Sequence, residues 1–169
     1  MSPEHDEELV KKYPLLYAQR EMSMRDTCMC WGFECGPGWY DIIDRLSAKI
    51  EAINNEIKAE REAHSVELDA EPYDDLCFIE AVQVKEKFGG LRFYLGPVLA
   101  KYDEQVYKWI EEAEQEAEKT CERCGKPGKA RGGGWIMTLC DGCKREDDES
   151  KEKALKEYEE KRKKEGPKA

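Results

Sequence analysis

The sequence predicts an α+β fold in which two main amphipathic helices pack on a β-hairpin, followed by a C-terminal zinc ribbon and a charged tail. Three patterns predict it. Apolar residues recur at helical spacing in two stretches, residues 39–57 and 99–117. Between these stretches, two strand-like runs flank Gly89-Gly90. Beyond the second stretch, two Cys-x2-Cys pairs have the spacing of a four-thiolate zinc site.

The chain divides by composition into three predicted segments. We expect an α+β domain over residues 1–119, the ribbon over 120–145 and a charged tail, helical or disordered, over 146–169. The net charge is −10 and no apolar run reaches membrane-spanning length. Since the first residues also lack a signal-peptide pattern, we expect a cytoplasmic protein with no membrane partner. Thiols stay reduced there, which favours metal binding over disulfides.

The first 39 residues predict a short helix and then an irregular loop. Ser2-Pro3-Glu4 combines an N-cap, a proline at the first helical position and an acidic first turn. Tyr13-Pro14 should end this helix, because a residue before proline avoids the helical region. Residues 28–39 are dense in glycine, cysteine and aromatic side chains, so we expect a compact loop. Its partly buried rings would be Trp31, Phe33 and Trp39.

Two longer helices form the predicted core. The first has on one face Trp39, Ile42, Ile43, Leu46, Ile50, Ile53 and Ile57. The second has on one face Leu99, Tyr102, Val106, Trp109, Ile110, Ala113 and Ala117. The acidic stretch up to Asp75, broken by Pro72, reads as a linker or exposed loop between the first helix and the hairpin.

The hairpin should turn at Gly89-Gly90, since glycine tolerates positive φ at both turn positions. That register places Lys87 opposite Arg92, which is unfavourable by a few tenths to about 1 kcal/mol unless something compensates. Neutralisation by an acidic side chain of the chain itself is one explanation, and an anionic ligand is the other. The same register places Glu86 among apolar neighbours, which requires either a buried cation or a different register.

The second explanation defines a candidate ligand site. It comprises Lys85, Lys87, Arg92 and Tyr94 on the hairpin, together with Trp31, Glu34 and Trp39 from the aromatic loop. Such a surface suits a protein partner or an anionic small molecule such as a nucleotide. We therefore predict a non-catalytic binding module.

The strongest site prediction is one structural Zn²⁺. Its ligands would be Cys121, Cys124, Cys140 and Cys143. Gly125 follows the first pair, where positive φ is usually needed. Residues 121–145 hold six basic and two acidic side chains, a formal +4, which a zinc tetrathiolate of charge −2 cuts to +2. Nucleic-acid binding by the ribbon cations is an alternative that this low charge does not favour. Those cations are Arg123, Lys126, Lys129 and Arg131.

Other sites are weaker. A second metal would need Cys28, Cys30, Cys35 and Cys77, but Cys-x-Cys-x4-Cys matches common zinc spacings poorly, and buried thiols are the alternative. We predict no catalytic residue, because neither histidine lies in a catalytic pattern. A metal-dependent phosphoesterase or nuclease remains the enzymatic alternative. Its carboxylates would be Glu34, Asp41, Asp44 and Glu80.

Three motifs together resemble a group of small uncharacterised proteins encoded by phages, prophages and bacteria. They are the loop Cys30–Trp39 (CWGFECGPGW), the hairpin Val84–Tyr94 (VKEKFGGLRFY) and the four-cysteine ribbon. The resemblance covers roughly residues 13–143, judged by motif order. It implies an accessory role in a phage-infected or prophage-bearing cell and carries over no catalytic residue.

Overall fold

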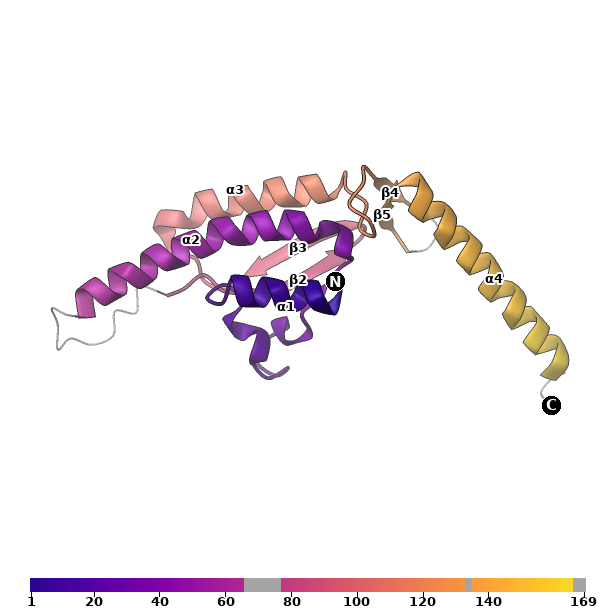
Figure 1. The fold of residues 1–169 in the computed structure, drawn as a ribbon, viewed down its shortest axis with the longest axis horizontal. Coiled ribbons are helices and arrows are strands. Elements are labelled where there is room, and N and C mark those ends of the chain that lie inside the picture. Colours follow the sequence, from indigo (N-terminus) through magenta and orange to yellow (C-terminus); the bar gives the residue numbers. More distant parts are fainter. Residues whose placement is uncertain (66–76, 133–134, 166–169) are drawn as a thin grey trace.

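The structure is a computed structural model that describes residues 1–65, 77–132 and 135–165. Within these residues it has four α-helices and two small sheets (Figure 1), so its mixed α+β class is the one that the sequence predicts. The α-helices are α1 (Pro3–Lys12), α2 (Tyr40–Ser65), α3 (Ala100–Ala117) and α4 (Asp141–Glu165). The strands are β1 (Phe33–Glu34), β2 (Ala81–Lys87), β3 (Gly90–Leu95), β4 (Lys129–Arg131) and β5 (Met137–Leu139). The predicted acidic linker, at residues 66–75, lies outside the described residues.

Helix α1 starts and stops where its sequence signals predict. The Ser2 hydroxyl accepts a hydrogen bond from the His5 amide at 3.3 Å, and Pro3 is the first helical residue. Tyr13 closes the C-terminus, because its amide bonds the Leu9 carbonyl while its own backbone has left the helical region. The chain then continues through short 3-10 turns at Ala18–Glu21, Met29–Trp31 and Pro37–Trp39.

Helix α2 is the centre of the core. The predicted apolar face, from Trp39 to Ile57, is buried, and α2 runs beside α3 (Figure 1). Buried polar groups of α2 hold the loops that pass over it. The Glu51 carboxylate accepts the amides of Leu15 and Leu16 at 3.0 and 2.8 Å. These bonds satisfy backbone groups that burial would otherwise leave unpaired.

The main sheet has the order β1-β2-β3, with β1 parallel to β2 and a β2–β3 hairpin. The predicted turn was wrong by one position. Lys87 pairs with Gly90, so the two turn residues are Phe88 and Gly89, both with positive φ (55° and 78°). In this register Lys85, and not Lys87, lies opposite Arg92.

This register also explains Glu86. It lies opposite Leu91, and its carboxylate accepts the Gly89 amide at 2.6 Å, so the carboxylate bonds the turn and needs no buried cation. Below the hairpin, α3 contacts both β3 and α2. The Glu114 carboxylate of α3 accepts the Phe93 amide at 3.2 Å.

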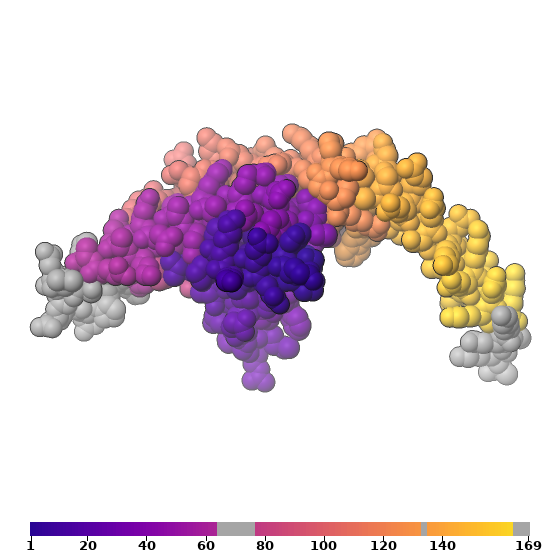
Figure 2. All heavy atoms as spheres, in the orientation of Figure 1, coloured from indigo at the N-terminus to yellow at the C-terminus, as the bar shows by residue number. Residues whose placement is uncertain are grey.

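Helix α4 differs from the predicted charged tail in where it begins. It starts at Asp141, so Cys143 already belongs to its first turn and no boundary separates the ribbon from the helix. The helix then extends clear of the body (Figures 1 and 2), with its distal turns exposed. None of the described helices is both long enough and apolar enough to cross a membrane.

Candidate metal centre and exposed clefts

The four ribbon thiols converge on one point. Their sulfurs all lie within 4.8 Å of one another, and the Cys124 and Cys140 sulfurs are 3.7 Å apart. In a tetrahedral site with metal–sulfur bonds of about 2.3 Å, geometry separates the sulfurs by about 3.8 Å. The four cysteines therefore fit a metal ion that binds thiolates.

Each cysteine pair sits on a tight backbone turn. In the first, the Gly125 amide donates to the Cys121 carbonyl at 2.9 Å, and Gly125 adopts a φ of 73° that few other residues tolerate. In the second, the Cys143 amide donates to the Cys140 sulfur at 3.4 Å. That bond is the main cause that lowers the pKa of Cys140 to about 7, which favours the thiolate that a metal requires.

The ribbon is docked on the aromatic loop. The Gly38 amide donates to the Glu122 carbonyl at 2.7 Å, and the Gly36 amide donates to the Glu122 carboxylate at 2.9 Å. The indole of fully buried Trp39 donates to the Thr120 carbonyl at 2.8 Å. The first cysteine turn thus rests on Gly36–Trp39, a contact that we call the knuckle seat.

Two glycines make the knuckle seat sterically possible. A Cβ added to Gly38 would lie 2.2 Å from the Cys121 carbonyl oxygen, and one added to Gly36 would lie 2.3 Å from the Glu122 carbonyl oxygen. Both obstacles are backbone atoms, so no side-chain movement relieves them. The Gly-Pro-Gly run was the sequence signal for this contact, although a loop alone was predicted from it.

The ribbon also meets the tip of the hairpin. The buried Thr138 hydroxyl donates to the Gly89 carbonyl at 2.6 Å, while the Thr138 carbonyl accepts the Glu122 amide at 2.9 Å. One threonine therefore joins the hairpin turn to the cysteine turn. The ribbon is fixed to the body at two points.

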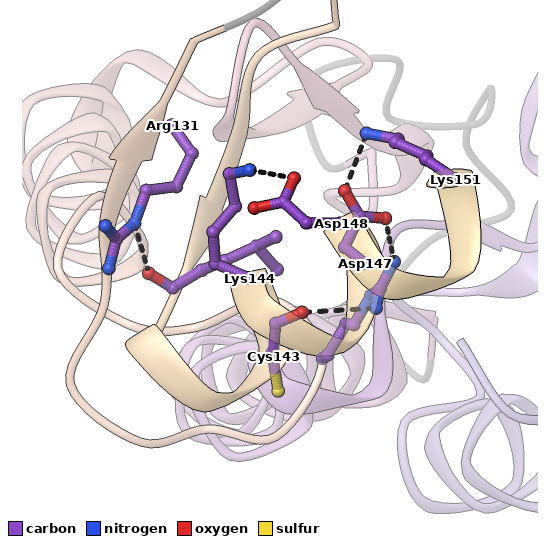
Figure 3. Close-up of polar contacts among 8 residues, drawn as sticks. Arg131, Cys143, Lys144, Asp147, Asp148 and Lys151 are labelled. Carbon is purple, nitrogen blue, oxygen red and sulfur yellow. Dashed lines mark hydrogen bonds and ion pairs between the residues drawn. The ribbon is translucent and has the colours of Figure 1, made fainter. Parts of the chain in front are cut away.

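The first turns of α4 are held to the ribbon by charge pairs (Figure 3). The Asp147 carboxylate accepts from Arg123 at 2.7 Å and from Lys151 at 2.6 Å. Lys151 and then Arg123 hold the pKa of Asp147 below its usual value. Arg131 pairs with Asp141. Two of the four ribbon cations proposed for nucleic-acid contact are thus engaged within the chain.

The predicted ligand residues do not form one site. Trp39 is buried in the knuckle seat, and Arg92 faces Glu114, with 3.5 Å between guanidinium nitrogen and carboxylate oxygen. Glu34 accepts from Gln83 at 3.1 Å. Trp31 is 60% exposed, so the expectation of a partly buried ring was wrong.

The remaining predicted residues line two separate hollows. Lys85 and Tyr94 line an open groove of about 550 Å³ on the outer face of the hairpin. Lys87 lines a cleft of about 380 Å³ between the hairpin tip and the ribbon. The other residues of this cleft are Glu86, Phe88, Trp135 and Ile136, of which sequence reasoning missed the three apolar ones. Exposure of apolar side chains depends on the tertiary fold, so the sequence carried no direct signal for them.

Within the described residues, the ribbon cysteines are the only cluster of three or more potential metal ligands. The predicted second cysteine site does not assemble. Cys35 is buried, which raises the pKa of its thiol to about 12, whereas Cys28 is exposed. The Asp44 carboxylate, proposed for a phosphoesterase centre, accepts from Lys12 and Tyr13, each at 2.7 Å.

Comparison of the chain with protein-family models, curated proteins and solved structures finds no match.

Proposed function

We propose that this protein is a zinc-stabilised, non-catalytic module that binds an apolar segment, flanked by acidic residues, of a partner protein. One observation carries the proposal: Phe88 is held in a left-handed conformation and is 73% exposed. It lines the cleft between hairpin and ribbon, which we call the tip cleft.

The conformation of Phe88 has an energetic cost. A left-handed backbone costs an L-residue roughly 1–2 kcal/mol, and two-residue hairpin turns normally use Asn or Gly here. Burial of the ring does not offset that cost, because most of the ring faces solvent. Strain of this kind is typical of residues retained for contacts with a ligand or partner.

The neighbours of Phe88 support a protein partner. Trp135 is 72% exposed and Ile136 is also exposed, and both line the tip cleft. Exposed aromatic side chains around a hollow are typical anchors of protein–protein interfaces. Three large apolar groups from two elements form a contact surface for an apolar segment.

Charge supports an acidic flank on that segment. The Glu86 carboxylate accepts the Gly89 amide, whereas Lys87 makes no ion pair with any residue that the structure describes. The Lys87 ammonium lies over the Phe88 ring, 5.5 Å from its centroid, so a carboxylate beside an apolar group on this ring would meet it.

The metal is proposed to be one Zn²⁺, since four thiolates complete a closed tetrahedral site with no open position for a substrate. Cys121, Cys124, Cys140 and Cys143 would hold it. Its role would be structural, because the ribbon carries Trp135 and Ile136 and its Thr138 bonds the hairpin turn. The resemblance to phage and prophage proteins favours a partner in the cytoplasm of a phage-infected or prophage-bearing cell.

Peptide display tests this proposal. Random peptides selected on the zinc-loaded protein should be enriched in aromatic or aliphatic residues beside Asp or Glu. Selected peptides, measured by fluorescence anisotropy, should bind Phe88→Ser and Trp135→Ser about tenfold or more weakly, as expected for interface anchors. Lys87→Met should weaken the binding of acidic peptides by a smaller factor.

Tyr107→Ser is the matched control, because Tyr107 is a half-exposed aromatic on α3 outside the tip cleft. It should leave affinity unchanged. If the selected peptides bind Phe88→Ser and Trp135→Ser as tightly as the wild type, the proposal is contradicted. Dimerisation of the purified protein that Phe88→Ser abolishes would show that a second copy covers the cleft, and would also contradict it.

A further inference from the structure

We infer that a second site, independent of the tip cleft, binds a nucleoside phosphate in the open groove on the outer face of the hairpin. This groove lies between the loop at residues 24–28 and strands β2 and β3, and has a volume of about 550 Å³. That volume lies within the range of small-molecule sites, roughly 300–1,000 Å³.

The two walls of the groove are fixed to each other. The Thr27 hydroxyl donates to the Val82 carbonyl of β2 at 3.3 Å and accepts the Met29 amide at 3.1 Å. The Asp26 amide donates to the Ser23 carbonyl at 2.9 Å, which closes the loop as a turn. The groove is therefore formed before any ligand arrives, which lowers the entropic cost of binding.

Two cations that line this groove have no carboxylate partner among the described residues. Arg25 comes from the loop and Lys85 from β2, and neither makes an ion pair within the described part of the chain. Arg92, on the same face, does face a carboxylate, that of Glu114. Arg25 and Lys85 thus provide the positive charge that a phosphate requires.

The groove also offers an aromatic side chain, Tyr94, on which a base can stack. Tyr94 is 41% exposed in the groove, and the Lys85 ammonium lies 5.7 Å from the centre of its ring. Because the Lys85 ammonium lies over the Tyr94 ring, a base that stacks on this face would take its place, and the displaced ammonium would then meet the phosphate at the ring edge. Stacking on an aromatic side chain accepts any base, because every base has a π-face.

The rest of the lining completes the match. Val82, Leu95 and Met24 give apolar contact for the edges of a base and a sugar. The Asp26 carboxylate would repel a bare anion but would accept a hydrogen bond from a ribose hydroxyl or a ring N–H. The combination favours a nucleoside phosphate over inorganic phosphate, and over an uncharged nucleoside.

Two readouts on the full zinc-loaded chain test the inference. Titration calorimetry would use the adenine, guanine, cytosine and uracil nucleoside monophosphates, with adenosine and inorganic phosphate as probes of the separate parts. The second readout is alkylation of Cys28, an exposed thiol that lines the groove, followed by mass spectrometry. We expect at least one monophosphate to bind with a millimolar or lower Kd and to slow Cys28 alkylation. Adenosine and phosphate should each bind at least about tenfold more weakly.

Matched variants separate a site from general charge attraction. Lys85→Met should weaken the bound monophosphate about tenfold, while Lys87→Met, two residues along the same strand but in the tip cleft, should change its Kd less than about twofold. Tyr94→Leu should weaken binding, and Tyr107→Leu should not.

The inference is overturned if no monophosphate at millimolar concentration gives heat or protects Cys28. It is equally overturned if Lys85→Met and Lys87→Met weaken binding alike, because the attraction would then come from the surface as a whole. Peptide binding at the tip cleft is measured separately, so failure of either site leaves the other result intact.

Discussion

The four-cysteine ribbon contacts the rest of the molecule at two places, one closed to solvent and one open to it. At the knuckle seat it is closed: Trp39 is fully buried and the Gly36 and Gly38 amides have partners on Glu122. At the hairpin tip it is open: among the described residues one hydrogen bond, from the Thr138 hydroxyl to the Gly89 carbonyl, joins the two, and large apolar side chains face solvent around it. The first contact sets the position of the ribbon, and the second uses that position to present a surface.

Removing the metal should break both contacts and have the largest effect. Cys124→Ser should lose zinc and destabilise the ribbon by about 4 kcal/mol or more, since metal binding drives the folding of such sites. Hydrogen exchange should show loss of protection at the Gly38 and Gly125 amides, with the α2 core retained. Metal analysis should give near one zinc for the wild type and for the control Cys28→Ser. If the Cys124→Ser ribbon stays folded and its amides remain protected from exchange, the metal does not hold the knuckle seat.

Substitution of a seat glycine should break the closed contact alone. In Gly38→Ala the new Cβ meets the Cys121 carbonyl, so the backbone must move, and we expect a loss of about 3 kcal/mol in urea denaturation. Gly132→Ala is the control, because nothing lies within 4 Å of the added Cβ, and its stability should match the wild type. Equal stability of the two variants would mean that the seat is not closely packed.

The charge pairs at the start of α4 should give a smaller, pH-dependent effect. Asp147→Asn should cost about 1 kcal/mol at neutral pH, because it weakens the contacts with Arg123 and Lys151. The pKa of Asp147 is lowered in the folded protein, so its contribution is complete above the ordinary Asp pKa and is lost as pH falls through the lowered value. The difference between wild type and variant should therefore close below about pH 4 in thermal scans. If the stability difference between wild type and Asp147→Asn does not change with pH, the carboxylate charge is not its cause.

The open contact should respond in the opposite direction. Phe88→Gly relieves the left-handed strain and gives up little burial, so it should stabilise the protein by about 0.5–1 kcal/mol while abolishing peptide binding. Denaturation curves beside the anisotropy assay measure both. Trp135→Ser should leave stability within about 0.5 kcal/mol. Destabilisation by Phe88→Gly would make Phe88 a packing residue instead.

Local patterns predicted the parts of the fold that local physics decides. The spacing of the cysteine pairs predicted the four-cysteine cluster, and the apolar period from Trp39 to Ile57 predicted the buried face of α2. The hairpin turn was misplaced because Gly89-Gly90 satisfies intrinsic turn preference better than Phe88-Gly89 does. Pairing with β1 and packing on α3 set the register, and such contacts cannot be read from turn residues alone.

The candidate site was predicted less completely for the same reason. The sequence predicted one cationic face on the hairpin, formed by Lys85, Lys87 and Arg92. The side chains that these three cations contact are set by the tertiary fold. Arg92 pairs with Glu114 of α3, while Lys87 lines the cleft beside the ribbon and Lys85 lines the groove beside residues 24–28. Arg25 lines the groove and Trp135 lines the tip cleft only because segments distant in sequence meet there.

Helix α4 gives the metal centre a mechanical reach. Its 25 residues span about 37 Å at the usual rise, and its first turn contains Cys143. Leu155 and Tyr158 are exposed about 18 and 22 Å along the helix from Cys143, so a tilt of the cysteine turn by about 5° would displace these side chains by about 2 Å. Helix α4 is therefore a lever arm between the four-cysteine cluster and two exposed apolar side chains far from it.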